Sequence, residues 1–241
     1  MLKTLKFKGD EANYFFVSDL HYNHNRDFIY TKRKGIKENY YQSESEHANG
    51  IIEVWNQRCN NQSIVFNLGD ITFNDGDGEK FKTLVRRLNF KTMYLLYGNH
   101  TSGHRQVYLE TLKAQHPNAF NDDGTFNYEV YPLKMAVDGN PNKVVIFVPQ
   151  YAEALINSTQ IVLCHYPIIS HNEMGHMSIH CCGHSHGSCE FTNKDIGHGF
   201  RLDVGVESFG GPINLLEVKH HLKDRQIESY DHHNPLTTRS K

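Results

Sequence analysis

The chain of 241 residues is 38% hydrophobic and 12% aromatic, and its formal net charge at pH 7 is −2. This length suffices to bury one large core, and the near-neutral charge excludes the strongly basic composition of general nucleic-acid binders. The sequence lacks an apolar run near the roughly 18 residues of a membrane span, and its start lacks the apolar region of a signal peptide. We therefore expect a cytoplasmic protein that does not contact membranes.

Short apolar runs recur along the chain, and each of them ends in a polar cluster. They are residues 14–18, 63–68, 92–97, 161–164 and 178–182. Their β-branched and aromatic side chains are typical of buried strands. Between the first three runs, residues 43–60 and 78–88 carry apolar side chains at helical spacing. This alternation predicts a parallel sheet with right-handed crossovers.

The second half of the chain has a different pattern. Residues 151–164 predict a hairpin, and residues 200–207 and 213–218 predict further strands. We expect an α/β fold in which two packed β-sheets carry helices on the outside. The expected single domain covers residues 1–219, and a polar C-terminal tail covers residues 220–241.

The polar clusters at the strand ends carry oxygen and nitrogen donors. Ligand sites in parallel sheets form beyond the carboxyl ends of the strands, so these side chains are expected to meet. The set suits Mn²⁺, Fe or Zn²⁺ better than Ca²⁺ or Mg²⁺, and it is too large for one ion. We therefore expect two divalent metal ions bridged by one aspartate, with Mn²⁺ favoured and Fe, Zn²⁺ and Ni²⁺ as alternatives. The expected ligands are Asp19, His21, Asp70, Asn99, His165, His184 and His186.

The order of these motifs resembles the calcineurin-like metallophosphoesterase superfamily. Its series D-x-H, G-D, G-N-H, a lone H and G-H-x-H stands here as Asp19-Leu20-His21, Gly69-Asp70, Gly98-Asn99-His100, His165 and Gly183-His184-Ser185-His186. The agreement extends from residue 14 to about residue 218. The segments "SDLHYNH", "GHSHG" and "DVGVE" resemble, more narrowly, a compact bacterial and phage branch. The resemblance implies a four-layer αββα sandwich.

The resemblance also implies a role for each motif residue. Asp19, His21 and His186 would hold the first ion, Asn99, His165 and His184 the second, and Asp70 would bridge them. A hydroxide between the ions would attack phosphorus in line, so the bridging aspartate and the asparagine are catalytic residues as well as ligands. His100 would act as general acid toward the leaving oxygen. Most relatives have an acidic residue after this histidine, where this chain has Thr101.

The sequence indicates a phosphoester substrate without identifying it. The open sites of compact family members favour a phosphodiesterase, possible substrates being a nucleotide or nucleic acid. A phosphomonoesterase or phosphoprotein phosphatase, and a non-catalytic metal-binding regulatory module, are the alternatives. His24 and Arg26 follow the first motif closely enough to contact a substrate phosphate. The basic residues Lys32, Arg33 and Lys34 are weaker candidates for this role, because a solvated loop is expected there.

The remaining cysteines and histidines are expected to be structural or exposed. The chain has 5 cysteines, an odd number that predicts free thiols in a reducing compartment. Cys181 and Cys182 are expected as buried thiols on opposite faces of a strand, and alternation is expected to send His184 and His186 the same way. A surface position is expected for His47, His104, His116, His220, His221, His232 and His233.

Overall fold

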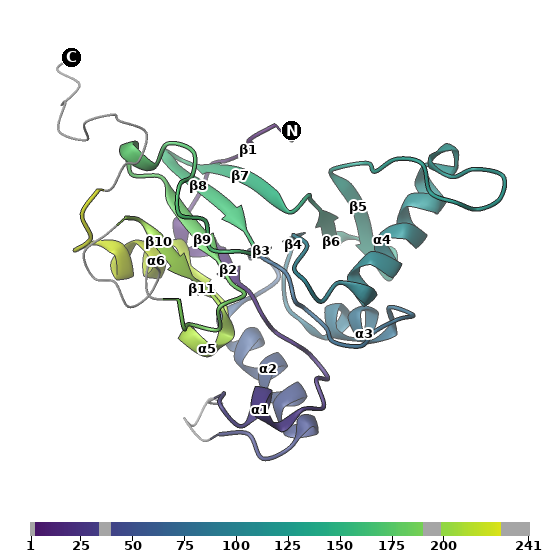
Figure 1. Ribbon diagram of the computed structural model, residues 1–241, viewed down its shortest axis with the longest axis horizontal. Coiled ribbons are helices and arrows are strands. Elements are labelled where there is room, and N and C mark those ends of the chain that lie inside the picture. Colours follow the sequence, from purple (N-terminus) through teal and green to yellow (C-terminus); the bar gives the residue numbers. More distant parts are fainter. Residues whose placement is uncertain (1–2, 34–39, 190–198, 228–241) are drawn as a thin grey trace.

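The fold consists of two β-sheets and a set of helices (Figure 1). The computed structural model describes residues 3–33, 40–189 and 199–227. One sheet has six strands and the other has five, and each contains parallel and antiparallel neighbours. The expected α/β fold with two mixed sheets flanked by helices is therefore confirmed.

The six-stranded sheet carries the first three polar clusters. Its strands are β2 (Tyr14–Val17), β3 (Ile64–Asn67), β4 (Thr92–Leu95), β5 (Leu133–Val137), β6 (Asn140–Phe147) and β11 (Ile213–Asn214). They lie in the order β11-β2-β3-β4-β6-β5, with the four central strands parallel and the two edge strands antiparallel. The carboxyl ends of β2, β3 and β4 therefore reach the same edge of the sheet.

The five-stranded sheet carries the last two polar clusters. Its strands are β1 (Leu5–Phe7), β7 (Tyr151–Ile156), β8 (Thr159–Cys164), β9 (Ile179–Cys182) and β10 (Arg201–Asp203). They lie in the order β1-β7-β8-β9-β10. Strands β7 and β8 form the predicted hairpin, and β8 and β9 run parallel, so that their carboxyl ends also coincide.

Three helices, α2 (Glu44–Arg58), α3 (Glu79–Arg87) and α4 (Ser102–Gln115), pack on the outer face of the six-stranded sheet. The other helices are α1 (Asp27–Tyr30), α5 (Val206–Phe209) and α6 (Leu215–Leu222), with 3-10 helices η1 (Glu11–Asn13), η2 (Pro117–Ala119) and η3 (Met174–His176). Ser43 caps α2 by accepting a hydrogen bond from the Glu46 amide, which explains why the helix begins there. Within the described ranges, no helix is long and apolar enough to cross a membrane.

Two hydrophobic clusters hold the layers together. One contains Trp55 of α2, Phe81 of α3 and Tyr108 of α4 against the six-stranded sheet. The other lies between the two sheets and includes Phe66 of β3 and Leu163 of β8, with the buried side of α6. The segment that joins β8 to β9 covers the far side of the five-stranded sheet, where the Ile168 amide donates to His180 and the Ile169 carbonyl accepts from Arg201.

Two predictions about the end of the chain were wrong in detail. The strand expected over residues 213–218 is only the short β11, because Asn214 and Glu217 form a capping box that starts α6. Residues 220–222, which were expected at the start of the polar tail, belong to this helix, because α6 continues to the buried side chain of Leu222. Residues 228–241 lie outside the described residues.

The surface position expected for His47 and His104 was also wrong, whereas His116, His220 and His221 are exposed as expected. His104 lies on the buried side of α4, and its ring stacks on Tyr97 at 4.0 Å between ring centroids. Helical position, rather than polarity, decides which side chains of an amphipathic helix are buried. His232 and His233 lie outside the described residues.

His104 should make the stability of the protein depend on pH. Burial lowers its pKa to about 3, whereas an unfolded histidine titrates near its ordinary value. The unfolded chain therefore binds the extra proton as the pH falls below about 6.5, and the free energy of unfolding decreases by about 1.4 kcal/mol per pH unit from this residue. We expect His104→Phe to have a shallower slope between pH 4 and 6 in urea denaturation. His116→Gln, at an exposed position, should keep the wild-type slope, and identical slopes for all three proteins would contradict the assignment.

Candidate metal centre

The expected ligand residues gather where strands of both sheets end. Asp19 follows β2, Asp70 follows β3, Asn99 follows β4, His165 follows β8, and His184 and His186 follow β9. Backbone hydrogen bonds join these ends, from the Asp19 amide to the Gly69 carbonyl (3.1 Å) and from the Gly183 amide to the His165 carbonyl (2.8 Å). Segments far apart in the sequence therefore meet at the carboxyl ends of the strands in each sheet.

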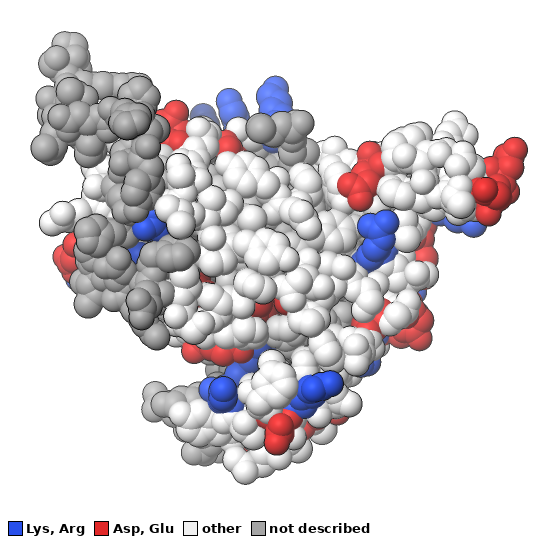
Figure 2. All heavy atoms as spheres, viewed as in Figure 1, with Lys and Arg blue, Asp and Glu red and all other residues white. Residues whose placement is uncertain are grey.

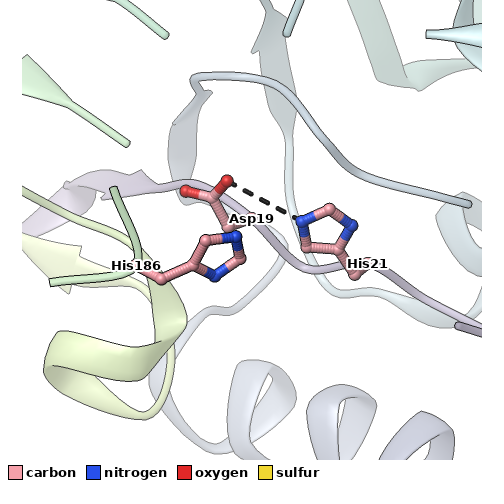
Figure 3. A group of neighbouring side chains, drawn as sticks. All are labelled: Asp19, His21 and His186. Atoms are coloured by element: carbon pink, nitrogen blue, oxygen red, sulfur yellow. Dashed lines mark ion pairs between the residues drawn. The ribbon is translucent and has the colours of Figure 1, made fainter. Parts of the chain in front are cut away.

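One group of possible ligands consists of Asp19, His21 and His186 (Figure 3). Each offers one ligand atom, and these atoms all lie within 4.8 Å of one another. His21 Nε2 lies 3.9 Å from Asp19 Oδ1, and the rings of His21 and His186 are stacked with centroids 5.3 Å apart. These three residues are the ones expected at the first ion.

Asp70 lies between this group and the histidine that follows β8. Its Oδ2 atom is 3.7 Å from His21 Nε2 and 3.5 Å from His165 Nε2. Asp70, His165 and Asp19 also form a group whose ligand atoms lie within 4.8 Å. One carboxylate thus faces ligands expected for the first ion and a ligand expected for the second ion. This is the position that a bridging ligand requires.

Asn99 joins the two histidines expected at the second ion. Its Oδ1 atom lies 2.9 Å from His165 Nε2 and 2.9 Å from His184 Nδ1. The His184 backbone amide donates to Asp19 Oδ2 (2.9 Å), which connects this half of the centre with the first. All seven residues selected by the motifs therefore lie in one continuous cluster.

Buried polar atoms of this cluster have unused hydrogen-bonding capacity. Asp19 Oδ1 and both ring nitrogens of His21 are buried, and none of them makes a hydrogen bond to the chain as described. Such atoms are costly to bury and uncommon in folded proteins. A divalent cation coordinated by these oxygen and nitrogen donors would satisfy them, so the residues fit a metal ion.

The electrostatics of the cluster also favour a cation. Burial raises the pKa of Asp19 to about 7, and the nearby carboxylates of Glu207 and Asp70 add to this rise. Burial lowers the pKa values of His21 and His165, which keeps both imidazoles in the neutral form that binds metals. A bound cation would stabilise the ionised form of Asp19 and accept the lone pairs of these neutral imidazoles.

The backbone at these positions has an unusual conformation. Left-handed φ angles occur at Asp19 (59°), His21 (46°), Asp70 (52°), His184 (67°) and His186 (49°). Each costs about 1–3 kcal/mol outside glycine, and such residues concentrate at functional sites. The same angles show that alternation was the wrong reason for the placement of His184 and His186. Strand β9 ends at Cys182, and the turn beyond it sends one ring to Asn99 and the other to Glu207.

Two motif glycines allow the strand ends to approach closely. A Cβ atom on Gly98 would collide with Asp70, and one on Gly183 would collide with Ser18 and Asp19. Glycine is needed at these positions for space, since neither has a positive φ angle. Cys181 and Cys182 are fully buried, as expected, and Cys59, Cys164, Cys181 and Cys182 are free thiols.

Comparison with protein families agrees with this geometry. The family model described as "Calcineurin-like phosphoesterase" matches residues 13–188, which include the metal-centre motifs. The chain belongs to the calcineurin-like phosphoesterase family. Members of this family typically bind divalent metal ions and hydrolyse phosphoesters, in agreement with the Asp and His groups of this centre.

A solved structure with a similar fold is the "Protein of Unknown Function AQ665 from Aquifex aeolicus". The similarity covers 86% of this chain and 97% of that one, with a TM-score of 0.50 and 16% sequence identity. At this identity the likeness shows the fold alone. No significant match was found among curated protein sequences.

His100 lies at the exposed side of the phosphoesterase centre. Its backbone amide donates to Asp70 Oδ1 (2.8 Å), so it is anchored on the residue between the two groups. Its ring centroid lies 5.3 Å from that of His21 and 5.0 Å from that of Phe73. Thr101 follows it at the start of α4 and makes no side-chain capping bond.

The two residues expected to contact substrate differ in exposure. Arg26 is exposed at the start of α1. His24 is buried, and its ring packs on Phe73 with centroids 3.8 Å apart. Burial and the charge of Arg33 lower the pKa of His24 to about 4, which argues against its role as an added cation. A contact between either residue and a substrate phosphate stays a prediction.

Two residues, Glu207 and Arg33, support the centre in a way that the sequence does not predict. Glu207 Oε1 lies 2.7 Å from His186 Nδ1 and accepts hydrogen bonds from Arg33 Nη2 (2.6 Å) and Nε (2.8 Å). Arg33 was expected in a solvated loop, but it is buried and also donates to the carbonyls of Asp19 (2.6 Å) and Leu20 (2.7 Å). Lys34 and the rest of that basic run, up to residue 39, lie outside the described residues.

Proposed function

We propose that this calcineurin-like phosphoesterase is a phosphodiesterase that uses two divalent metal ions, with Mn²⁺ as the expected metal. The observation that carries the proposal is the position of Asp70. One of its oxygens faces His21 and His165 from the two halves of the centre, and the other accepts the backbone amide of His100. This carboxylate can therefore hold two ions at a short separation and fix the proton donor beside them.

In the proposed mechanism most of these residues bind the metal ions, and one residue transfers a proton. Asp19, His21 and His186 would hold one ion, and Asn99, His165 and His184 the other, with Asp70 between them. When bound, the two ions would supply an activated water and neutralise charge on the phosphoryl oxygens. His100 would donate its proton to the leaving ester oxygen, for which its anchored backbone and exposed ring suit it.

The charges around the centre support a diester rather than a monoester substrate. A phosphodiester carries one negative charge, whereas a monoester carries up to two. Arg33 is buried and engaged with Glu207, and His24 is held neutral by burial. Arg26 is exposed to solvent. A singly charged substrate therefore fits the described surroundings better.

The test measures hydrolysis of bis-p-nitrophenyl phosphate by protein that has been stripped of metal and reloaded with Mn²⁺. We expect activity to return with Mn²⁺ and to be lost in Asp70→Asn and His165→Ala, because each removes a ligand from the centre. Asp122→Asn and His116→Ala change the same residue types at exposed positions outside the motifs and should remain active. The rate on mono-p-nitrophenyl phosphate should be lower than on the diester.

Two results would contradict this proposal. A clear preference for the monoester would replace the phosphodiesterase by a phosphomonoesterase or phosphoprotein phosphatase. Full occupancy by Mn²⁺, Fe²⁺, Zn²⁺ or Ni²⁺ without turnover of either ester would favour the non-catalytic regulatory module. In that case the first explanation to test for the missing turnover would be Thr101, which stands where most relatives have an acidic residue after the histidine.

A further inference from the structure

A cavity of about 790 Å³ lies directly beside the metal centre. Gly98 lines it and lies so near Asp70 that a Cβ atom on this glycine would collide with the Asp70 carboxylate. The other walls come from the start of α4, the segment before β5 and the crossover from β6 to β7. The cavity therefore opens where the chain passes from one sheet to the other, next to the carboxyl ends of β4 and β6.

Aromatic rings form much of the cavity wall. Tyr97, Tyr131 and Tyr151 line it, and Tyr151 pairs with Cys164 in the β7–β8 ladder, one residue before His165. The ring of Tyr131 is held in place because it stacks on the ring of Tyr108, with 5.3 Å between centroids. The Tyr151 hydroxyl already donates to Glu153 (2.7 Å), which leaves its ring as the part available to a ligand. Such rigid rings favour a flat ligand.

A pair of opposite charges lies in the same wall. Arg105 and Glu129 line the cavity and are 3.9 Å apart, with exposed fractions of 46% and 45%. At this distance and exposure the two groups attract each other weakly, so both can exchange partners with a ligand. Guanidinium offers hydrogen-bond donors and carboxylate offers acceptors. A flat ligand with both acceptors and N–H donors on its edge would match this pair.

The size of the cavity, and the surface charge of the face shown in Figure 2, favour a small substrate over a polymer. A volume of about 790 Å³ is in the range of cavities that hold a small organic ligand. Proteins that bind long nucleic acids present a continuous basic surface to the phosphate backbone. Among the residues coloured in Figure 2, Lys and Arg form no continuous band across the centre of the face shown.

We propose that this cavity, called here the ring cavity, binds the nucleoside part of a phosphodiester whose phosphoryl group lies at the metal centre. The inference rests on the function proposed above and assigns its substrate class. The base lies among Tyr97, Tyr131 and Tyr151, and its polar edge faces Arg105 and Glu129. Gly98 and Thr101 form the passage from the base to the reacting phosphorus.

The first test measures binding without catalysis. The full chain with Mn²⁺ is titrated by calorimetry with adenosine, guanosine, cytidine and thymidine, which contain no ester bond to cleave. We expect at least one nucleoside to bind, and Arg105→Gln/Glu129→Gln to weaken it about tenfold because hydrogen bonds to charged groups are lost. Arg86→Gln/Asp138→Asn removes another exposed ion pair (2.8 Å) and should leave the affinity unchanged. Preferential binding of tyrosine amide would overturn the assignment in favour of a peptide substrate.

The second test compares two esters that share a leaving group. Thymidine 5′-(p-nitrophenyl phosphate) and methyl p-nitrophenyl phosphate differ in the part that would occupy the ring cavity. Tyr151→Leu should lower kcat/KM about tenfold for the nucleotide ester and little for the methyl ester, while Tyr151→Phe keeps the ring and the preference. If Tyr151→Leu lowers kcat/KM equally for both esters and leaves nucleoside binding unchanged, the ring cavity does not bind the nucleoside. The proposed function would remain intact. If the wild-type protein hydrolyses neither ester, the proposed function is refuted. The calorimetric titration with nucleosides would then still show whether the ring cavity binds a nucleoside.

Discussion

Replacing His100 by alanine is expected to lower kcat/KM by about 10²–10⁴-fold for a dialkyl phosphate and much less for a nitrophenyl ester. The alkoxide that leaves from an alkyl ester is strongly basic and needs a proton as the P–O bond breaks. Nitrophenolate is a stable anion and leaves without one. The amide of His100 is fixed on Asp70 at 2.8 Å while its side chain is exposed, an arrangement that the proposed proton transfer requires.

The measurement compares methyl and p-nitrophenyl leaving groups on the same phosphodiester scaffold, in the wild type and in His100→Ala. His116→Ala, at an exposed position outside the centre, serves as the control and should leave both rates unchanged. Metal content is measured for each protein, since His100 is outside the expected ligand set and its loss should not release metal. Equal losses for both leaving groups would show that His100 acts in some way other than as general acid.

The sequence alone could locate the ligand cluster because its residues share one structural signal. Each follows a buried strand, and parallel strands place their carboxyl ends together. Asp19, Asp70 and Asn99 are brought together by β2, β3 and β4 in this way. The hairpin and parallel pairing of the second sheet do the same for His165 and His184.

The parts of the site that could not be predicted depend on contacts between residues that no periodic sequence pattern marks. Arg33 follows a short helix in a basic run, and nothing in its neighbours indicates that its charge is buried against Glu207. The segment "DVGVE" is predicted as part of a strand and belongs to the family resemblance, but neither pattern indicates that its two acidic residues support the turn that carries His184 and His186. The tyrosines of the ring cavity come from three distant segments, and only the assembled sheets bring them together.

The carboxylate of Glu207 is expected to set the metal affinity of the first half of the centre. Its Oε1 atom faces His186 Nδ1 at 2.7 Å, and a proton on that nitrogen leaves the lone pair of Nε2 for an ion. Burial disfavours the ionised form of Glu207, but the charges of Arg33 and His186 outweigh it and hold its pKa at about 2. A permanently ionised partner orients the imidazole and makes it a stronger ligand.

We expect Glu207→Gln to weaken binding of one of two Mn²⁺ ions by about 10–100-fold, because outer partners of metal-bound histidines typically contribute that much. Calorimetric titration of the stripped protein should then resolve one weak and one nearly unchanged site. Glu173→Gln is the matched control, since Glu173 pairs with His176 Nδ1 at 2.9 Å on an exposed part of the surface. Its metal affinity should equal that of the wild type.

Loss of structure must be separated from loss of this contact. Glu207→Gln leaves the buried Arg33 without its charge partner, which is expected to destabilise the fold by about 3–5 kcal/mol. Urea denaturation of the metal-free proteins measures that cost directly. Arg33→Lys keeps a positive charge but cannot reach Glu207, Asp19 and Leu20 together, so it should be destabilised while Glu207 still faces His186. If both variants lose metal in proportion to their loss of stability, Glu207 acts through the fold alone. If Glu207→Gln loses far more affinity than Arg33→Lys at similar stability, its carboxylate acts on His186 itself.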